Sequence, residues 1–152
     1  MSTPRRLPTV ILISGRGSNL HAILRAVAGQ ALPIDVRAVI SNRPAAPGLT
    51  LARAAGIPAE ILDHTAFPNR QSFDDALQNL IDSHTPELVV LAGFMRILSP
   101  GFVSHYHGRM LNIHPSLLPA FTGLDTHRRA LEAGVREHGA SVHFVTHALD
   151  GG

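Results

Sequence analysis

Short apolar runs alternate with amphipathic segments along the whole chain, and this alternation restricts its possible fold more than any other feature. Continuous apolar runs predict strands, whereas apolar residues spaced three and four apart predict helices. We expect strands at 9–13, 34–40, 59–62, 87–91, 109–113 and 141–145, and helices at 18–28, 48–55, 69–83, 100–105 and 126–133. Strands joined by helices pair in parallel through right-handed crossovers. The sequence therefore predicts an α/β fold, an open, doubly wound, mostly parallel sheet with helices on both faces.

Three polar or glycine-rich segments are expected where strands of this sheet end. Residues 15–19 follow the first strand, residues 93–98 follow the fourth, and residues 112–119 span the end of the fifth. In open parallel sheets, ligands bind beyond the carboxyl ends of the strands. The sequence therefore predicts the functional site at this edge.

Length and composition favour a single soluble domain, residues 1–152. The chain is 45% hydrophobic, which suits one substantial core. No apolar run approaches the roughly 20 residues of a membrane span, so no membrane partner is expected. The absence of cysteine excludes a disulfide scaffold and a thiol nucleophile and is compatible with a cytoplasmic protein. Because the chain stops in a turn-like Asp150-Gly151-Gly152, we expect the sequence to be part of a longer protein.

The charge pattern gives nucleic-acid binding little support. The formal net charge is only +2, and all 13 basic residues are arginines scattered between Arg5 and Arg136. They form no dense basic stripe and have few aromatic residues between them. We therefore expect small-molecule partners and no nucleic acid.

The glycine-rich segment Ser14–Asn19 is suited to binding a phosphate. Its two glycines let backbone amides approach an anion, Ser18 and Asn19 add side-chain donors, and a helix begins there. It lacks the Gly-Lys-Ser/Thr of a Walker loop, and Leu20 replaces the third glycine of a dinucleotide fingerprint. NAD is therefore disfavoured, and NADP is weakly supported by Arg43. The alternative is a tight strand-to-helix turn capped by Ser18, with no ligand.

Asn112, His114 and Asp150 are the candidate catalytic residues. Asn112 and His114 are two apart on a predicted strand, so both side chains project to one side, and Pro115 then ends the strand. Asp150 follows the last predicted strand. In acyl transfer to an amine, an amide and an imidazolium can donate to the developing oxyanion, and a carboxylate can stabilise the imidazolium. The alternative is that these residues serve only in turns and caps.

A metal centre is not expected, although the chain has ten histidines. The pairs His105/His107 and His143/His147 have ligand-like spacing. However, His143 lies within an apolar strand, and neither a cysteine nor a second acidic cluster completes a zinc site.

Four segments, together with Asp150, resemble the phosphoribosylglycinamide formyltransferase family, folate-dependent enzymes of purine synthesis. They are Ser14–Leu20, Leu91–Leu98, Asn112–Pro119 and Ser141–Thr146. The Asn-x-His…Asp trio is shared with other formyltetrahydrofolate enzymes, and the glycine-rich segment points to this family. The resemblance implies a Rossmann-like formyltransferase fold. It also implies formyl transfer from 10-formyltetrahydrofolate to the amine of 5′-phosphoribosylglycinamide, without a metal and in the cytoplasm, and it is compatible with a homodimer.

The resemblance also implies roles for individual residues. Gly17, Ser18 and Asn19 would bind the substrate phosphate, and Pro115 would lie beside the glycinamide arm. Asn112 and His114 would polarise the formyl group, while Asp150 would tune His114 and order a proton-relaying water. The expected folate contacts are Arg70, Met95, Arg96, Ile97, Leu98, Asn112, Thr146, His147, Ala148, Leu149 and Asp150.

Three departures from the family are visible. The family continues for some tens of residues beyond the Asp-Gly-Gly turn, with a further strand and helix. Asp125 stands where relatives often have histidine, and His147-Ala148 replaces a commonly acidic pair in the folate loop. Two other functions remain open: a formyltetrahydrofolate hydrolase, and a catalytically impaired folate- or nucleotide-binding fragment. Hydrolase relatives usually carry an additional N-terminal domain, which we do not expect before the first strand.

Overall fold

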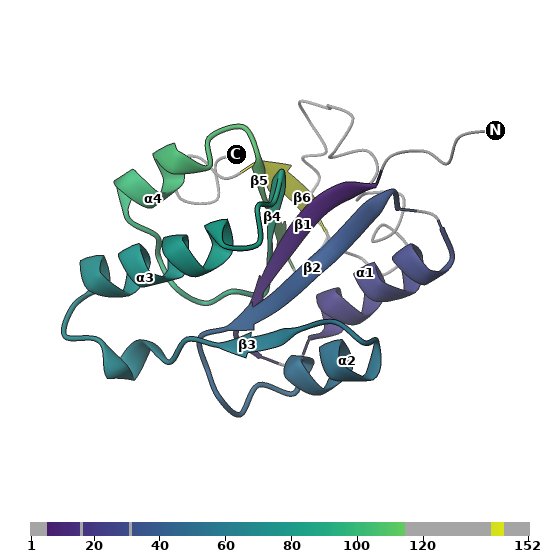
Figure 1. Cartoon of the computed structure of the whole chain (residues 1–152), viewed down its shortest axis with the longest axis horizontal. Helices are drawn as coiled ribbons and strands as arrows, with labels where there is room; N and C mark the ends of the chain where they lie inside the picture. Colours follow the sequence, from purple (N-terminus) through teal and green to yellow (C-terminus); the bar gives the residue numbers. More distant parts are fainter. Residues whose placement is uncertain (1–5, 16, 31, 115–140, 145–152) are drawn as a thin grey trace.

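The computed structural model describes residues 6–15, 17–30, 32–114 and 141–144. These residues form a six-stranded sheet of order β3-β2-β1-β4-β5-β6 (Figure 1). The strands are β1 (Leu7–Ile13), β2 (Ile34–Ser41), β3 (Ala59–Ile61), β4 (Leu88–Ala92), β5 (Met110–His114) and β6 (Ser141–Phe144). Strands β1 to β5 pair in parallel, as the alternating sequence pattern predicts.

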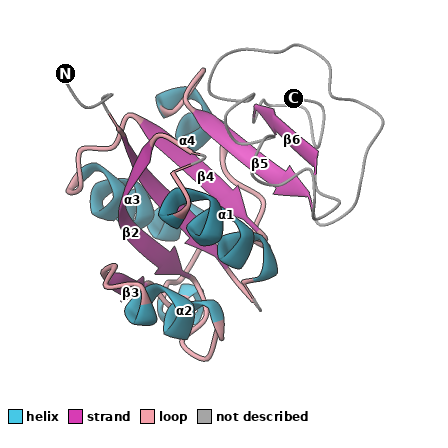
Figure 2. Ribbon diagram, turned by 90° about the vertical axis from the view of Figure 1, so that its right-hand side faces the viewer, coloured by secondary structure: helices cyan, strands magenta, loops and turns pink. Residues whose placement is uncertain are grey.

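Helices cover both faces of the sheet (Figure 2). They are α1 (Ser18–Ala28), α2 (Gly48–Ala54), α3 (Arg70–Asp82) and α4 (Pro100–His105), with a 3₁₀ turn η1 (His64–Ala66). Alternate residues of β1 serve the two faces: Ile11 and Ile13 pack with α1 and α2, whereas Val10 and Leu12 pack with α3 and α4. The doubly wound architecture is therefore confirmed. The predicted bounds of α1 and α4 are confirmed, and those of the other described elements differ by at most two residues.

The chain reverses its direction across the sheet at β1. From β1 it passes outward to β2 and β3, then returns to the other side of β1 to form β4 and β5. The two crossovers diverge at the carboxyl ends of β1 and β4, and in open α/β sheets this is the place where ligands bind. The described residues of the segments predicted to be functional (15, 17–19, 93–98 and 112–114) lie at this edge.

Strand β6 is an exception to parallel pairing. It runs antiparallel to β5, with Leu111 opposite Phe144 and His114 opposite Ser141. The run 141–145 predicts a strand but not its direction, because direction depends on the path of the preceding chain. The predicted helix 126–133 lies outside the described residues.

Short-range hydrogen bonds define where the helices begin. The Asn69 side chain accepts the Ser72 amide at 2.8 Å and starts α3, and Ser99 caps α4 before Pro100. Helix α1 differs, because its N-cap is Gly17 in the left-handed conformation, with φ of +83°. The alternative in which Ser18 caps this helix is therefore wrong. Ser18 is the first helical residue, no described side chain caps the helix, and Ser18 is exposed.

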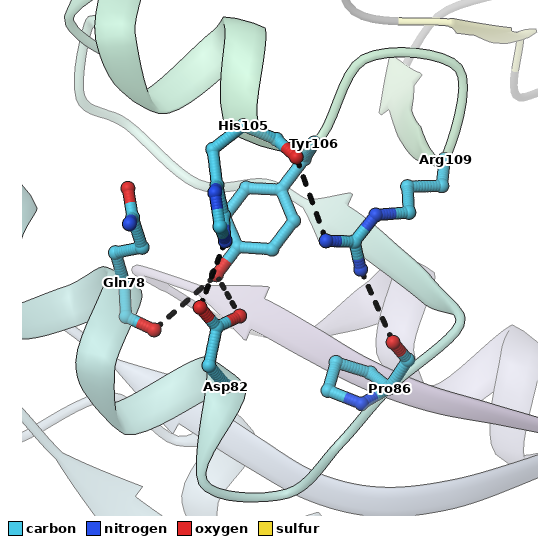
Figure 3. A network of polar contacts seen from close by, with 6 residues as sticks. All are labelled: Gln78, Asp82, Pro86, His105, Tyr106 and Arg109. Atoms are coloured by element: carbon cyan, nitrogen blue, oxygen red, sulfur yellow. Dashed lines mark hydrogen bonds and ion pairs between the residues drawn. The ribbon is translucent and has the colours of Figure 1, made fainter.

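A polar network ties α3 and α4 to the start of β5, away from the carboxyl ends of the strands (Figure 3). The buried Tyr106 hydroxyl donates to Asp82 Oδ1 at 2.7 Å, and the His105 ring contacts Asp82 Oδ2 at 2.8 Å. Arg109 donates to the Pro86 carbonyl and lies 4.8 Å above the Tyr106 ring. This network stabilises the fold and uses His105, one of the histidines with ligand-like spacing.

Tyr106→Phe is expected to remove about 1.5 kcal/mol of stability near neutral pH, since it deletes a hydrogen bond to a carboxylate. Burial, followed by the contact with Asp82, raises the pKa of Tyr106 well above its usual value. The folded state thus retains a proton that the unfolded chain loses near pH 10, so wild-type stability should fall as pH rises above about 10. The variant should lack that fall. Because the chain has one tyrosine, no lysine and no cysteine, denaturant melts from pH 8 to about 11 isolate this effect.

Candidate active site

The glycine-rich segment turns tightly from β1 into α1 and packs against the start of α2. Gly17 has a positive φ, and a Cβ built on it would lie 2.8 Å from the Gly48 Cα. The Gly48 amide also donates to the Gly15 carbonyl at 3.3 Å. Both the backbone conformation and this close approach therefore require glycine at position 17.

This turn presents a helix N-terminus, which is suited to binding an anion. The first backbone bond within the turn runs from the His21 amide to the Gly17 carbonyl at 2.7 Å. The preceding amides, including those of Ser18 and Asn19, have no acceptor within the helix, and they carry the positive end of its dipole. With the exposed Ser18 hydroxyl beside them, they have the donor chemistry that a phosphate requires.

A side-chain contact connects the glycine-rich segment to β5. The Asn19 Nδ2 group donates to the Ile113 carbonyl at 3.5 Å, across 94 positions of sequence. Ile113 lies between Asn112 and His114, so the candidate phosphate site adjoins the strand that carries two candidate catalytic residues. Asn112 is half-buried, and strand alternation places it on the α3/α4 face of the sheet, opposite to Leu111 and Ile113.

The segment after β4 lies at the same edge. Gly93 turns it with φ of +77°, and the Met95 amide donates to Ser14 Oγ at 2.8 Å. The Met95 and Ile97 side chains are 71% and 61% exposed, whereas Arg96 and Leu98 are half-buried. Large exposed apolar side chains that lie together are typical of binding sites.

Two cationic side chains predicted to be near the folate have different surroundings. Arg70 is exposed at the first residue of α3, which begins on the carboxyl side of β3. The Arg96 guanidinium lies 4.6 Å above the buried Phe73 ring, and among the described residues its Nε atom is buried without a hydrogen-bond partner. Arg96 is therefore held against α3.

Several predicted site residues cannot be placed. Pro115, Thr146, His147, Ala148, Leu149 and Asp150 all lie outside the described residues, as does the substituted position Asp125. For His114 the structure describes the backbone, which ends β5 opposite Ser141. The convergence of Asn112, His114 and Asp150 therefore stays a prediction.

The structure also shows polar residues that sequence reasoning did not single out. Ser14 Oγ donates to Asn42 Oδ1 at 2.5 Å, and Asn42 contacts the His64 ring. The buried Asp74 of α3 accepts the Ser99 amide. The sequence contains one feature that could have indicated Ser14 and Asn42: each is a polar residue directly after an apolar strand, β1 and β2 respectively.

The described part of the chain contains no group of three or more histidine, cysteine or acidic residues that could hold a metal ion. Nor does it include a helix long and apolar enough to cross a membrane.

Comparisons with known proteins identify relatives of this arrangement. The family model described as formyl transferase matches residues 7–152. The chain is 59% identical to phosphoribosylglycinamide formyltransferase of Escherichia coli, over 94% of this chain and 68% of that protein. It is 44% identical to the human trifunctional purine biosynthetic protein adenosine-3, over 97% of this chain and 15% of that protein.

A solved structure agrees in both fold and sequence. Phosphoribosylglycinamide formyltransferase from Coxiella burnetii superposes with a TM-score of 0.78 at 57% identity, over 97% of this chain and 69% of that one. The chain thus spans about two thirds of the length of these bacterial relatives. Because the family model covers nearly every residue and both the sequence and the sheet agree with its members, the chain belongs to the formyl transferase family.

Proposed function

We propose that the chain transfers the formyl group of 10-formyltetrahydrofolate to the amine of 5′-phosphoribosylglycinamide, a step of purine synthesis. The observation that supports this most directly is the Asn19–Ile113 contact, because it joins the start of α1, the proposed phosphate site, to the strand of Asn112 and His114. The similarity to phosphoribosylglycinamide formyltransferases supports the same substrates. We further propose that residues 1–152 form one formyltransferase domain that acts in the cytoplasm.

The ribonucleotide is proposed to bind through its phosphate at the start of α1. Gly17, Ser18 and Asn19 would supply backbone and side-chain donors, and Pro115 would lie beside the glycinamide arm. The helix dipole contributes only about 0.3–1 kcal/mol, so direct hydrogen bonds must provide most of the phosphate affinity.

The folate is proposed to lie against the segment after β4. Met95 and Ile97 offer exposed apolar surface, and the backbone of Arg96 and Leu98 would read the pterin. Arg70, Asn112 and the loop 146–150 would complete the pocket. Both substrates would then meet near the end of β5.

The proposed reaction needs charge stabilisation and proton transfer. The substrate amine attacks the formyl carbon, the C–N10 bond breaks, and a proton moves from the attacking nitrogen to the leaving nitrogen. Asn112 and protonated His114 would donate to the formyl oxygen, where one such donor is worth about 3–4 kcal/mol. Asp150 would stabilise the imidazolium and order a water that relays the proton, and acid–base catalysis of this kind gives roughly 10²–10⁴-fold.

The deciding experiment is spectrophotometric deformylation of 10-formyltetrahydrofolate with and without 5′-phosphoribosylglycinamide. Formyl transfer requires that tetrahydrofolate appears only when the ribonucleotide is present. Release at an equal rate without the ribonucleotide identifies a hydrolase, and no release in either case excludes both reactions and is the result expected of a non-catalytic fragment. Either of these two results overturns the proposal.

Ser18→Ala and Asn19→Ala are each expected to raise the KM for the ribonucleotide by about tenfold, since each removes a donor near a charged phosphate. The KM for the folate should change less than twofold. Steady-state kinetics with each substrate varied in turn measures both values. His21→Ala is the matched control, because His21 is exposed on the same helix. An equal rise in both KM values contradicts a phosphate site here.

A further inference from the structure

We propose that Ser14 and Asp74 are positioning residues that hold the segment 93–99, here named the pterin loop, at its two ends. This inference rests on the proposed function. It explains part of the affinity for the folate by the way this loop is held. The pterin loop carries the exposed Met95 and Ile97 and the backbone of Arg96 and Leu98. Two side chains that are distant in sequence, Ser14 and Asp74, bond to backbone amides of this loop.

The first end is held from β1. The Met95 amide donates to Ser14 Oγ at 2.8 Å, across 81 positions of sequence. The same hydroxyl donates its only proton to Asn42 Oδ1 at 2.5 Å. Because that proton is committed to Asn42, the oxygen presents a lone pair to Met95. Ser14 and Asn42 are 1% and 2% exposed, so water competes little for either bond.

The Asn42 side chain is supported in turn by η1. Its Nδ2 atom lies 3.3 Å from the His64 Nδ1 atom, which also lies 3.1 Å from the Asn42 carbonyl. In either tautomer the ring can bond to Asn42, either by accepting from the amide or by donating to the carbonyl. Asp63 accepts the Thr65 amide and hydroxyl at the start of η1, and these bonds hold the pKa of Asp63 below its usual value. The loop is therefore connected to β1, β2 and η1.

The second end is held from α3. Asp74 Oδ2 accepts the Ser99 amide at 2.8 Å, and Ser99 Oγ accepts the Phe102 amide to begin α4. Asp74 is 2% exposed, and among the described residues its Oδ1 atom has no hydrogen-bond partner. Within the described residues, this buried carboxylate accepts the Ser99 amide of the pterin loop, and burying a carboxylate with so few hydrogen bonds is costly.

Between the two ends, Arg96 lies over Phe73, the residue that precedes Asp74. The half-buried Arg96 thus faces α3, while its exposed neighbours Met95 and Ile97 are left for a ligand. A loop held in its binding conformation loses less conformational entropy when the ligand arrives, which increases affinity. The two bonds should therefore affect folate binding more than ribonucleotide binding.

The test compares Ser14→Ala and Asp74→Ala with matched controls. Thr9→Ala removes a buried hydroxyl within β1, which bonds the Leu7 carbonyl at 2.8 Å and lies toward the end of the strand away from Ser14. Asp75→Ala removes the exposed neighbour of Asp74 on α3. Asp74→Asn is the conservative variant, since its carboxamide oxygen can still accept the Ser99 amide.

Two readouts separate positioning from general stability. Each alanine variant should raise the KM for 10-formyltetrahydrofolate about tenfold and leave the KM for the ribonucleotide and kcat within about twofold. Amide hydrogen exchange without ligand should lose protection at Met95 in Ser14→Ala and at Ser99 in Asp74→Ala. Asp74→Asn should restore the wild-type values, and both controls should resemble the wild type in both readouts.

The outcomes distinguish this inference from the proposed function. If the wild-type chain transfers no formyl group, the proposed function fails, and amide exchange with calorimetric binding of 10-formyltetrahydrofolate still decides the positioning role. If transfer occurs but both alanine variants keep the wild-type folate KM, the inference is wrong. It is also wrong if both variants impair the folate KM, the ribonucleotide KM and kcat to the same extent. Should Ser14→Ala not fold, the comparison of Asp74→Ala with Asp74→Asn decides.

Discussion

His114→Ala is expected to lower the rate of formyl transfer by 10²-fold or more, with the KM for each substrate changed much less. The imidazole is proposed to donate to the formyl oxygen as negative charge develops there. This interaction is stronger in the transition state than in the bound substrate, so its loss appears in kcat. Single-turnover and steady-state measurements at saturating folate and ribonucleotide determine the effect.

The fold should tolerate this substitution. His114 is the last residue of β5. Its backbone pairs with Ser141 of β6, and alanine can keep that pairing. We expect the thermal midpoint to move by no more than about 4 °C. His107→Ala is the control, because His107 is exposed after α4, beyond the carboxyl end of that helix. Turnover within threefold of the wild type would eliminate the polarising role.

Gly17→Ala is expected to raise the KM for the ribonucleotide by about tenfold or more and to remove about 1–2 kcal/mol of stability. Two independent causes act together. The left-handed φ of +83° disfavours any residue with a Cβ, and that Cβ would lie 2.8 Å from the Gly48 Cα. Because the Gly48 Cα is backbone, it cannot rotate away. The turn must shift instead, and the amides at the start of α1 shift with it.

Gly15→Ala is the matched control for this prediction. A Cβ at position 15 meets no described atom within 4 Å, and Gly15 is not in the left-handed region. The ribonucleotide KM and the stability to denaturant are measured for both variants. The comparison separates the conformational requirement at position 17 from the general effect of replacing a glycine in this segment. Equal effects at positions 15 and 17 would contradict the proposed geometry of the phosphate site.

The turn after β1 contacts the segments of both proposed substrate sites. Ser14 touches the pterin loop through Met95, and five residues later Asn19 touches β5 through Ile113. A single turn after β1 thus lies between the proposed folate and ribonucleotide sites. This follows from the reversal of strand order, because β4 and β5 follow β1 in the sheet although they are far from it in sequence.

Much of this protein could be predicted from local sequence patterns. The apolar periodicity of 18–28 and the Ser99-Pro100 start of α4 determine those helices, because capping and amphipathic spacing act within a few residues. Alternation of strands and helices predicts parallel pairing for β1 to β5. The segments after β1 and β4 were also correctly predicted to share one edge, since carboxyl ends of parallel strands lie together.

Other features depend on residues that meet only in the folded chain. The antiparallel direction of β6, the contact of Ser14 with Asn42 and Met95, and the bond from Ser99 to Asp74 each join segments separated by tens of residues. No local periodicity encodes such pairs. Sequence thus determined which elements form and which end of the sheet carries the predicted site. The tertiary structure decided which side chains bond to the segments of that site, because packing brings together donors and acceptors that are distant along the chain.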